Sequence, residues 1–423
     1  MSVYKDLKER GLVDNTNSQD LETKLENDKH TFYVGFDPTA DSLHVGQLLV
    51  FNVMRILQKA GHTPVAVMGG GTGFIGDPGG KSAERTLLNP ETIEKNILGI
   101  RKQLEHFLDF KGKNSAFLVN NYNWLKNWSY IDFLREIGKH FSINQMITRD
   151  SVKSRIEREG SGISYTEFSY MLLQAYDFLY LAKEKNCSLQ LGGSDQWGNM
   201  VSGADLCRRL LKKEVFALTH PLLTKSDGSK FGKSEQGVVW LDAKKTSAFD
   251  FYQFFIRVED EDVIRFLKVL TQIPLERINE LEKITRESPE KREAQTELAD
   301  YLTALTHGTE ELTKIKKATR TLYGGKITDL DDLTISKIFK DAPSYKIEKE
   351  VLTKGWKLID ALVESKSCPS KSQARKLIAS GGVYVNNEQE KNVDFLLSNK
   401  NLASNSYLVL RTGKKNYRLI IIV

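Results

Sequence analysis

The chain has 423 residues and a net charge of +6, and it is too long for a single hydrophobic core, so two or three domains are expected. With 40% hydrophobic and 27% charged residues, its composition is that of a globular protein, which excludes a disordered or fibrous chain. No apolar run approaches the ~20 residues that span a bilayer, and the polar N-terminus is unlike a signal or transit peptide, so we expect a cytoplasmic protein without membrane contact.

Three short apolar runs predict strands of a parallel sheet. HTFYVGF (30–36) and HTPVAVMGG (62–70) lie on either side of a helical pattern (48–61), and such a unit implies a right-handed parallel crossover. The third run, CSLQLGG (187–193), also ends in glycine, and VVWL (238–241) is a further candidate that would pair nearby. Parallel sheets bind ligands outside the carboxyl ends of their strands, so we expect the site there.

Two glycine-rich motifs after the second strand resemble nucleotide-binding loops, and both fail in detail. GTGFIG (71–76) has the GxGxxG spacing of a dinucleotide fold, but loop and helix follow where a second strand ending in an acid is required. GDPGGKS (76–82) resembles a P-loop, whose first glycine would have to stand at Ile75. The remaining interpretation is a loop whose backbone approaches a small ligand, with the Asp77 carboxylate available to a cationic group.

A long buried helix is predicted over 165–185, because YTEFSYMLLQAYDFLYLAKEK is apolar almost all round. Tyr170, Gln174 and Asp177 nevertheless fall on one face, at i, i+4 and i+7. A buried polar group without a partner costs about 1–3 kcal/mol, so three together predict either a polar ligand or an internal hydrogen-bond network. The helix alone does not decide between the two.

Two polar segments downstream carry candidate nucleotide-binding groups. In QLGGSDQWGN (190–199) a strand ends in two glycines, and Asp195 follows at a helix entrance, where it suits a ribose or purine edge. The loop LLTKSDGSKFGKSEQG (222–237) carries Lys230 and Lys233, which are badly placed for a core and well placed to close over a triphosphate. A KxxKS string by itself is common in ordinary surface loops.

The remainder of the chain predicts helices followed by a small basic module. Residues 243–335 have amphipathic helical patterns, and a polar stretch at 340–352 is a candidate linker. Residues 358–387 contain a helix, a Pro-Ser break, a short helix, a Gly-Gly turn and a strand. Residues 351–423 hold 12 Lys and Arg against 5 Asp and Glu, a local charge of +7 that leaves −1 for the rest. This asymmetry favours a polyanionic partner, although a solubilising tail would carry the same charge.

The three cysteines, Cys187, Cys207 and Cys368, lie far apart and in no CxxC or Cys/His spacing. This spacing argues against a zinc site and against a disulfide framework. We interpret them as packing residues, and we expect no metal site built by the protein.

The order of these motifs resembles that of the class I aminoacyl-tRNA synthetases, whose HIGH-like and KMSKS-like signatures are matched by His44-Val45-Gly46-Gln47 and Lys230-Phe231-Gly232-Lys233-Ser234. More narrowly, nearly the whole chain is similar to bacterial-type tyrosyl-tRNA synthetases, whose motifs resemble YVGFDPTADSLHVGQ, GDPGGKSAER, NNYNWL, FSYMLLQAYDF and QLGGSDQWGN. One departure is Gln47, where the signature often has histidine, although an amide also donates to a phosphate oxygen.

The resemblance implies an α/β fold in three parts. A Rossmann-like parallel-sheet catalytic domain with a helical insertion would occupy residues 1–222, and the KFGKS loop with an α-helical anticodon-side domain would occupy 223–339. A linker (340–352) would lead to a small α+β S4-like RNA-binding domain (353–423). The family also implies a homodimer, with the contact around residues 110–190.

The implied activity is that of a tyrosine–tRNA ligase, with L-tyrosine, ATP with Mg²⁺ and tRNA(Tyr) as partners. The tyrosine carboxylate attacks the α-phosphorus of ATP, pyrophosphate leaves, and the 3′-terminal adenosine of the tRNA then takes the tyrosyl group. His44 stands at a helix N-terminus, where N–H groups and the dipole favour anions, and Gly46 leaves room for the nucleotide. Gln47, Lys230 and Lys233 would assist His44 in stabilising the transition state.

The other site residues are implied in the same way. The residues implied to bind ATP are Gly35, Asp37, Thr39, His44, Gly46, Gln47, Gly193, Asp195, Gln196, Lys230, Lys233 and Ser234. Those implied to bind tyrosine are Tyr33 and Asp177 at the phenol, Asp77, Tyr170 and Gln174 at the ammonium, and Gln190 nearby. Lys371, Arg375 and Lys376 share one side of a short helix, where they would track RNA phosphates or form a solvated basic face.

Two other functions are compatible with these motifs. A tryptophanyl-tRNA synthetase shares the fold and signatures, but a buried carboxylate such as Asp177 suits a phenol better, and the S4-like module points the same way. A catalytically idle RNA-binding relative would be expected to lose His44 or the lysine loop, and both are present.

Overall fold

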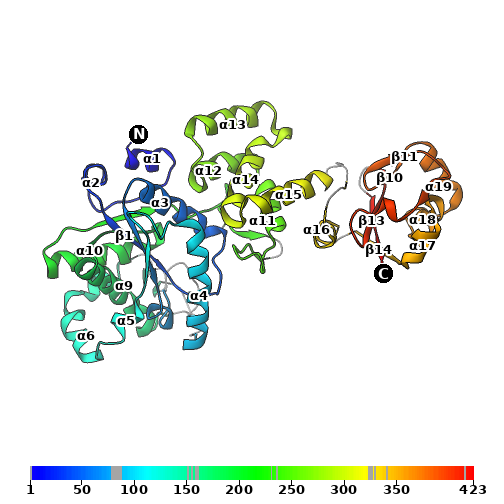
Figure 1. The fold of residues 1–423 in the computed structure, drawn as a ribbon. Helices are drawn as coiled ribbons and strands as arrows, with labels where there is room; N and C mark the ends of the chain where they lie inside the picture. The colour runs from blue at the N-terminus through cyan, green and yellow to red at the C-terminus, as the bar shows by residue number, and fades with distance from the viewer. Residues whose placement is uncertain are drawn as a thin grey trace. The chain divides into compact units, whose positions relative to one another are not determined.

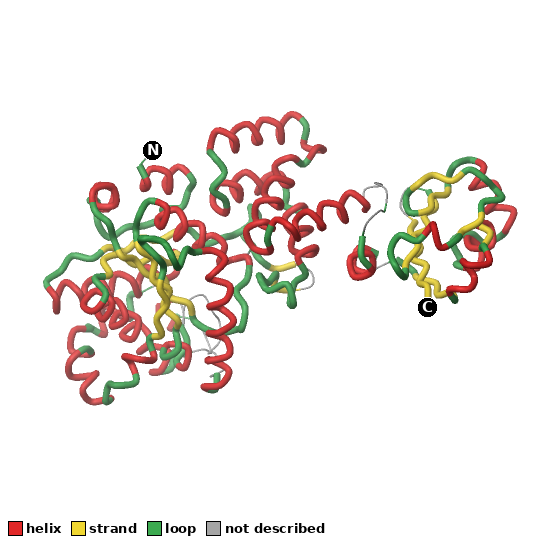
Figure 2. The backbone as a smooth tube through the Cα atoms, in the orientation of Figure 1, coloured by secondary structure: helices red, strands yellow, loops and turns green. Residues whose placement is uncertain are grey.

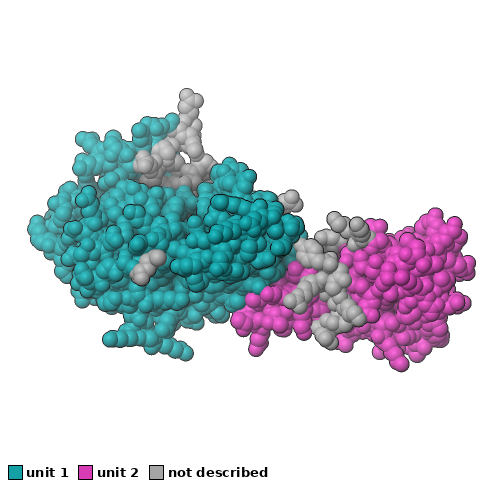
Figure 3. Space-filling view, turned by 90° about the horizontal axis from the view of Figure 1, so that it is seen from above, with its two compact units in different colours: residues 1–307 teal, residues 308–423 magenta. Residues whose placement is uncertain are grey.

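The computed structural model describes residues 2–77, 88–149, 152–153, 156–157, 162–229, 231–234, 237–322, 327, 330–339, 342–413 and 416–423. At 233–234, 320–322, 333 and 337 the description covers the backbone alone. The chain forms two compact units, Met1–His307 and Gly308–Val423, each coloured separately in Figure 3. Among the described helices, none combines the length and the apolar character needed to cross a bilayer.

Five parallel strands form the centre of the first unit, in the order β3-β2-β1-β4-β5 (Figures 1 and 2). They are β1 (Thr31–Phe36), β2 (Thr63–Met68), β3 (Phe117–Asn120), β4 (Cys187–Gly193) and β5 (Phe216–His220). Most of their apolar, β-branched side chains are buried, because helices cover a parallel sheet on both faces. The predicted strands β1, β2 and β4 are confirmed, whereas β3 and β5, which the sequence did not predict, form the edges.

Helices join and cover these strands. The four longest around the sheet are α3 (Leu48–Lys59), α4 (Pro90–Phe107), α9 (Tyr165–Glu184) and α10 (Trp197–Leu211). Figure 1 shows α3 and α4 on one side of the strands and α9 and α10 on the other. The predicted helical insertion precedes α9 and contains α5 (Tyr122–Leu125), α6 (Tyr130–Glu136) and α7 (Ile143–Met146). Because the chain passes from edge strand β3 to β4 beside β1, the strand order reverses between β1 and β4, which is where such sheets bind ligands.

The segment after β5 does not join this sheet. VVWL (238–241) was a candidate for pairing nearby, but β7 (Gly237–Val238) pairs antiparallel with β6 (Lys233–Ser234) in a separate two-stranded ribbon. Trp240 forms an isolated antiparallel bridge to His44. The start of the run therefore pairs with a strand close by in the sequence and not with the central sheet.

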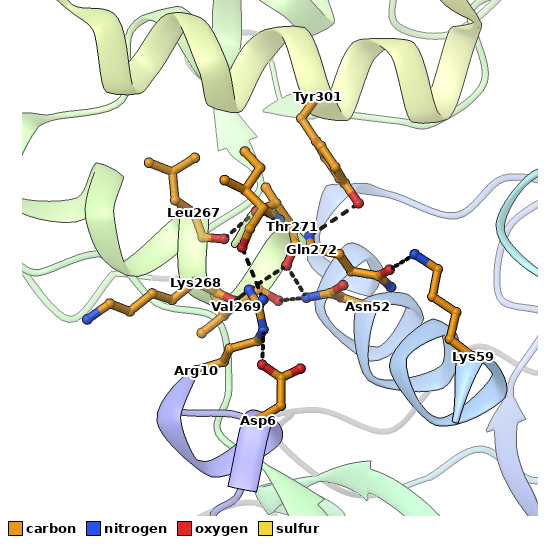
Figure 4. Close-up of polar contacts among 11 residues, drawn as sticks. Asp6, Arg10, Asn52, Lys59, Leu267, Lys268, Val269, Thr271, Gln272 and Tyr301 are labelled. Carbon is orange, nitrogen blue, oxygen red and sulfur yellow. Dashed lines mark hydrogen bonds and ion pairs between the residues drawn. The ribbon is translucent and has the colours of Figure 1, made fainter. Parts of the chain in front are cut away.

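A helical region completes the first unit. It contains α11 (Ala248–Ile256), α12 (Asp260–Leu270), α13 (Leu275–Glu287) and α14 (Glu293–His307). The carboxyl end of α12 leaves backbone carbonyls without partners inside the helix. Arg10 Nη1 donates to the Thr271 carbonyl at 3.1 Å, and Asn52 Nδ2 donates to the carbonyls of Val269 and Thr271, both at 3.0 Å (Figure 4). Both side chains are buried, so the start of the chain and α3 hold this region in place.

The second unit has a mixed sheet in the order β11-β10-β13-β14-β8. Its sheet strands are β8 (Ser344–Ile347), β10 (Val383–Val385), β11 (Glu388–Glu390), β13 (Tyr407–Thr412) and β14 (Asn416–Ile422). Its helices are α15 (Thr309–Leu322), α16 (Asp332–Ile338), α17 (Lys349–Lys354), α18 (Leu358–Glu364) and α19 (Lys371–Ala379). Leu358, Leu362, Ile378 and Leu410 are among the fully buried core residues. The helix, break, helix, turn and strand predicted over 358–387 are confirmed.

The observed units divide the chain differently from two of the predicted boundaries. The helical domain predicted over 223–339 divides at His307, because α11–α14 belong to the first unit and α15 and α16 to the second. The stretch predicted as a linker (340–352) is not a free connector over its described part, since β8 pairs in parallel with β14 and α17 follows it. The sequence of β8 is mostly polar because β8 is an edge strand, and Ile347 is its buried residue in the core. This polar composition is the reason why the sequence predicted a linker here.

Asn52→Ala should lower the free energy of unfolding by about 1–3 kcal/mol, because the carbonyls of Val269 and Thr271 lose a buried donor. Chemical denaturation monitored by circular dichroism measures the change. Asn127→Ala, at an exposed position, is the matched control and should change stability by less than about 0.5 kcal/mol. Equal effects of the two substitutions would contradict the role given to Asn52.

Candidate active site

Most of the site residues expected from the sequence line one cavity of about 360 Å³ at the carboxyl ends of β1 and β4. Those that line it are Tyr33, Gly35, Asp37, Thr39, Gly46, Gln47, Asp77, Tyr170, Gln174, Asp177, Gln190, Gly193, Asp195 and Gln196. Lys230 lies outside the described residues, and so do the side chains of Lys233 and Ser234.

One end of the cavity contains the buried carboxylate of Asp177, on α9. Its Oδ1 accepts a hydrogen bond from Trp124 Nε1 at 2.7 Å, and its Oδ2 accepts one from Asn121 Nδ2 at 2.9 Å. Burial raises the pKa of Asp177 to about 7, with a further increase from the charge of Asp37, although the two hydrogen bonds lower it. The carboxyl group is therefore fixed in orientation, and its remaining lone pairs face the cavity.

Two polar groups beside Asp177 have no partner among the described residues. The hydroxyl of Tyr33 and the Oε1 of Gln190 are both buried and make no hydrogen bond there. The two residues are register neighbours on β1 and β4, which places them together at the same depth. Burial, followed by the charge of Asp177, raises the pKa of Tyr33 above its usual range, so its O–H stays available as a donor. A donor and two acceptors thus converge on a space that suits a ligand hydroxyl.

Carboxylates and amides gather further along the cavity. Asp37 accepts hydrogen bonds from Thr72 Oγ1 at 3.0 Å and from Tyr170 Oη at 3.2 Å. Asp77 Oδ2 accepts one from Gln196 Nε2 at 2.7 Å. Two acids within one cavity favour a cationic ligand group. Asp37, which the sequence assigned to ATP, thus lies beside Tyr170, which the sequence assigned to the tyrosine ammonium, at the junction of the two regions.

The helix start at His44 orients a hydrogen-bond donor. The Gly46 N–H donates to His44 Nδ1 at 3.0 Å, and the His44 N–H donates to Gln47 Oε1 at 2.9 Å. Because a backbone N–H can only donate, the 3.0 Å contact makes Nδ1 the acceptor, and the neutral ring then carries its proton on Nε2. The Gln47 amide nitrogen lies 3.4 Å from Nε2, a longer contact that does not outweigh the bond to Nδ1. Burial lowers the pKa of His44, which keeps the ring neutral. An Nε2–H donor suits an acceptor-only group such as a phosphate oxygen.

The glycines of the site make room chiefly for protein side chains. An added Cβ on Gly46 would come within 2.7 Å of His44 Cε1, so the space predicted for a nucleotide there is taken by the imidazole. After β2, a Cβ on Gly69 would lie 2.3 Å from Asp37 Oδ1, and one on Gly70 would lie 2.2 Å from Asn120 Oδ1. These two glycines precede the GTGFIG motif and admit polar side chains, and Gly69 also lines the cavity. The expectation that the loop over 71–82 approaches a ligand stays a prediction.

The two signature segments meet in space. Gly232 has a φ of +103°, and an added Cβ would lie 3.2 Å from Val45 Cγ2 and 3.7 Å from the Gly46 nitrogen. The Val45 N–H also donates to the Val239 carbonyl at 3.0 Å. The backbone of the KFGKS segment is thus held against the helix start that lines the cavity, although the two are almost 190 residues apart in the sequence.

Comparison with known proteins supports one family. Residues 25–324 match the model for class I tRNA synthetases (W and Y), and residues 334–420 match that for the tyrosine–tRNA ligase SYY-like C-terminal domain. The chain is 48% identical over 421 residues to the tyrosine–tRNA ligase of Rhodopirellula baltica, covering 99% of this chain and 96% of that one. It is 47% identical to tyrosine–tRNA ligase 1 of Bacillus subtilis, covering 99% of both.

The chain belongs to the tyrosyl-tRNA synthetase family. Among solved structures, a C-terminally truncated mitochondrial tyrosyl-tRNA synthetase of Aspergillus nidulans is similar, with a TM-score of 0.67 and 32% identity over 76% of this chain and 94% of that one. This membership agrees with the fold and activity that the sequence motifs implied, and it favours tyrosine over the tryptophan alternative.

Sequence reasoning missed several residues of this synthetase site. Asn121 and Trp124, which hold Asp177, lie within the NNYNWL motif, and that motif was the available signal. Thr72 holds Asp37 and also accepts from Asn121 Nδ2 at 3.0 Å. His220 lines the cavity from β5, a strand that the sequence did not predict. These residues were missed because their partners are remote in sequence.

Tyrosine should bind this synthetase more weakly as the pH falls below 7. A phenol O–H donates best to the ionised carboxylate, so binding favours the charged form of Asp177, whose pKa is about 7 without ligand. The affinity should be full above pH 7 and fall by up to about tenfold per pH unit below it. Titration of tyrosine by intrinsic fluorescence between pH 5.5 and 8 measures this. Asp177→Asn should bind weakly and without the pH dependence, and a constant affinity of the unaltered protein would contradict the assignment.

Proposed function

We propose that this chain activates L-tyrosine with ATP and transfers the tyrosyl group to the 3′-terminal adenosine of tRNA(Tyr). The observation that carries the proposal is the shared cavity: Asp177 and Tyr33 line it together with Gly46 and Gln47 of the helix start. A single ligand can therefore reach from a hydroxyl-binding end to a phosphate-binding end. Because such an enzyme acts where translation takes place, we also propose a cytoplasmic location.

In the proposed first step, the tyrosine carboxylate attacks the α-phosphorus of ATP, and the bond from that phosphorus to the pyrophosphate oxygen breaks. The carboxylate is already ionised, so no general base is needed, and the protein contributes by orientation and charge stabilisation. His44 Nε2–H and the Gln47 amide donate toward the phosphates, while Asp77, Tyr170 and Gln174 hold the tyrosine ammonium. Lys230 and Lys233 are proposed to bind the triphosphate as the loop closes.

The remaining ATP contacts are proposed along the edge of β1 and β4. Gly35, Thr39, Gly193 and Asp195, which line the cavity, would lie beside the nucleoside. Gln196, also in the lining, and Ser234, whose side chain is outside the described residues, would add polar contacts. We expect Mg²⁺ to reach the site already bound to the phosphate oxygens of ATP. The described part of the chain contains no cluster of three His, Cys, Asp or Glu side chains that could hold a metal by itself.

In the second step, the ribose hydroxyl of the tRNA terminal adenosine attacks the carbonyl carbon of the adenylate and AMP leaves. We propose that the second unit binds this RNA through α19, where Lys371, Arg375 and Lys376 are exposed. Lys371 Nζ lies 2.7 Å from Asp360 Oδ1, but an exposed pair of this kind contributes little and can exchange for a phosphate.

We also propose a homodimer that uses the insertion between β3 and α9. Tyr130, Ile131, Ile143 and Tyr165 are each about 60–70% exposed there, which is unusual for large apolar side chains. Tyr130 and Tyr165 are adjacent, with their hydroxyls 3.3 Å apart. Exposed large apolar side chains of this kind fit a self-complementary interface.

Tyrosine-dependent ATP–pyrophosphate exchange tests the activity. Exchange is expected with tyrosine and not with tryptophan or phenylalanine, because the phenol pairs with Tyr33 and Asp177. Asp177→Ala should lower kcat/KM for tyrosine by about 10- to 100-fold, since a charge-assisted hydrogen bond is lost. Asp205→Ala, which removes a surface carboxylate paired with Arg208 and Arg209, is the control. Absence of exchange with all three amino acids would support the idle relative instead.

The salt dependence of tRNA binding tests the basic face. Arg375→Gln and Lys376→Gln should each weaken binding and reduce the slope of log affinity against log salt by about 0.7–0.9 per lost phosphate contact. Lys354→Gln, on α17 of the same unit, should leave the slope unchanged. Identical slopes for all the variants would show that α19 does not contact RNA.

Ile131→Glu should convert the dimer into monomers, because a charge would be buried in the interface. Sedimentation of the purified chain measures the mass of each species. Leu98→Glu, at an exposed leucine on α4, is the control and should leave the dimer intact. A monomeric unaltered chain would refute the proposed assembly.

A further inference from the structure

His220 is a cavity residue that none of the motifs above accounts for. It is the last residue of β5, at the carboxyl edge of the sheet, and its register partner on β4 is Gly193. It lines the same cavity as Gly193 and Asp195. It is therefore on the wall of the site and not on a remote surface.

The strand register places His220 at the nucleotide end of the cavity. Gln190 marks the phenol end, because it pairs with Tyr33, and Gly193 lies three positions further along β4. Three residues of a strand advance by about 10 Å. A tyrosine whose phenol meets Asp177 therefore places its carboxylate, and the adenylate joined to it, close to Gly193 and His220.

A neighbouring apolar group gives this end the character of a nucleoside site. Leu222 is 48% exposed, and its Cδ2 would lie 3.0 Å from a Cβ added to Gly193. Asp195 Oδ1 would lie still closer to that Cβ, at 2.6 Å, so a carboxylate and a leucine share the space over Gly193. This surface suits a planar base or the face of a ribose better than a hydrated phosphate chain.

The hydrogen bond from His220 to the backbone defines its tautomer. Nδ1 lies 3.0 Å from the Pro221 carbonyl oxygen, which can only accept, so Nδ1 carries the proton. Burial lowers the pKa of His220, although its own hydrogen bond and the charges of Asp195 and Asp14 raise it, so the ring is neutral at physiological pH. The other ring nitrogen, Nε2, then has a free lone pair, and no hydrogen bond to it is found among the described residues.

His44, which packs over the cavity-lining Gly46, and His220, which lines the cavity itself, thus present opposite chemistry. His44 keeps its proton on Nε2 and offers a donor, whereas His220 keeps its proton on Nδ1 and offers an acceptor. A phosphate oxygen only accepts, so it pairs with His44 and is repelled by the lone pair of His220. The donors of ATP are all on the nucleoside: the two ribose hydroxyls and the exocyclic amine of the base.

We propose that His220 accepts a hydrogen bond from the nucleoside of ATP through Nε2 and thereby contributes to the choice of nucleotide. The inference rests on the proposed tyrosine activation, since it places ATP in this cavity. The Asp195 carboxylate, a second acceptor in the cavity, lies beside Gly193, so the two side chains can divide the nucleoside donors between them.

The test measures pyrophosphate exchange with ATP, 2′-deoxy-ATP, 3′-deoxy-ATP and purine riboside triphosphate, each of the last three lacking one donor. The variants are His220→Asn, whose amide can keep the bond to the Pro221 carbonyl but not the Nε2 acceptor, and His220→Gln, whose Oε1 reaches toward the position of Nε2. Tyrosine binding by intrinsic fluorescence checks that the rest of the pocket is intact in both.

In the unaltered enzyme, the analogue that lacks the paired donor should have a KM about 3- to 10-fold above that of ATP. His220→Asn should reduce this ratio to about 1 for that analogue alone, and His220→Gln should restore part of it. The analogue affected identifies the donor as the 2′-hydroxyl, the 3′-hydroxyl or the amine. If His220→Asn keeps the ratios of the unaltered enzyme for all three analogues, the inference is overturned while the proposed activity stands. Absence of any tyrosine-dependent exchange in the unaltered chain would overturn the activity itself.

Discussion

The site depends on one constraint, the burial of the Asp177 carboxylate with two donors fixed behind it. A lone buried carboxylate is costly, and its protonation near neutral pH reflects that cost. Asn121 and Trp124 lower the cost and at the same time prevent the side chain from rotating. The acceptor that faces the cavity is therefore set in place before any ligand arrives, and a ligand gains the most by bringing a hydroxyl donor to it.

This arrangement exists because of the sheet topology. Asp177 comes from α9 and Tyr33 from β1, while the two donors to Asp177 are Asn121, directly after β3, and Trp124, on α5. Three separate segments must therefore be brought to the same edge. The reversal of strand order between β1 and β4 provides the crevice in which they meet. Arg10 and Asn52 then attach the helical region to the same sheet by capping the end of α12.

The helix start and the segment after β5 complete the opposite end of the cavity. His44 lies across Gly46, and the backbone of Gly232 packs against both, so the two signature segments form one surface. The backbone partners of His44 and His220 assign them opposite tautomers, and we propose that the donor pairs with the phosphates and the acceptor with the nucleoside. The second unit has its own sheet and core, which is consistent with a separate role in binding RNA.

The sequence by itself determined the strands β1, β2 and β4, the helix α9 and the helices α18 and α19, and it named most of the residues that line the cavity. Those features depend on local periodicity or on short motifs, which a single segment contains in full. It did not predict the edge strands β3 and β5, because a short strand shows little periodicity in its sequence. It also did not predict the pairing of β8 with β14 or the partners of Asp177, because these contacts join residues more than 50 positions apart. The tertiary structure alone decided that the space over Gly46 belongs to an imidazole and that the glycines after β2 admit Asp37 and Asn120. Which neighbour fills the space over a glycine depends on how distant segments pack, and a linear sequence does not contain that information.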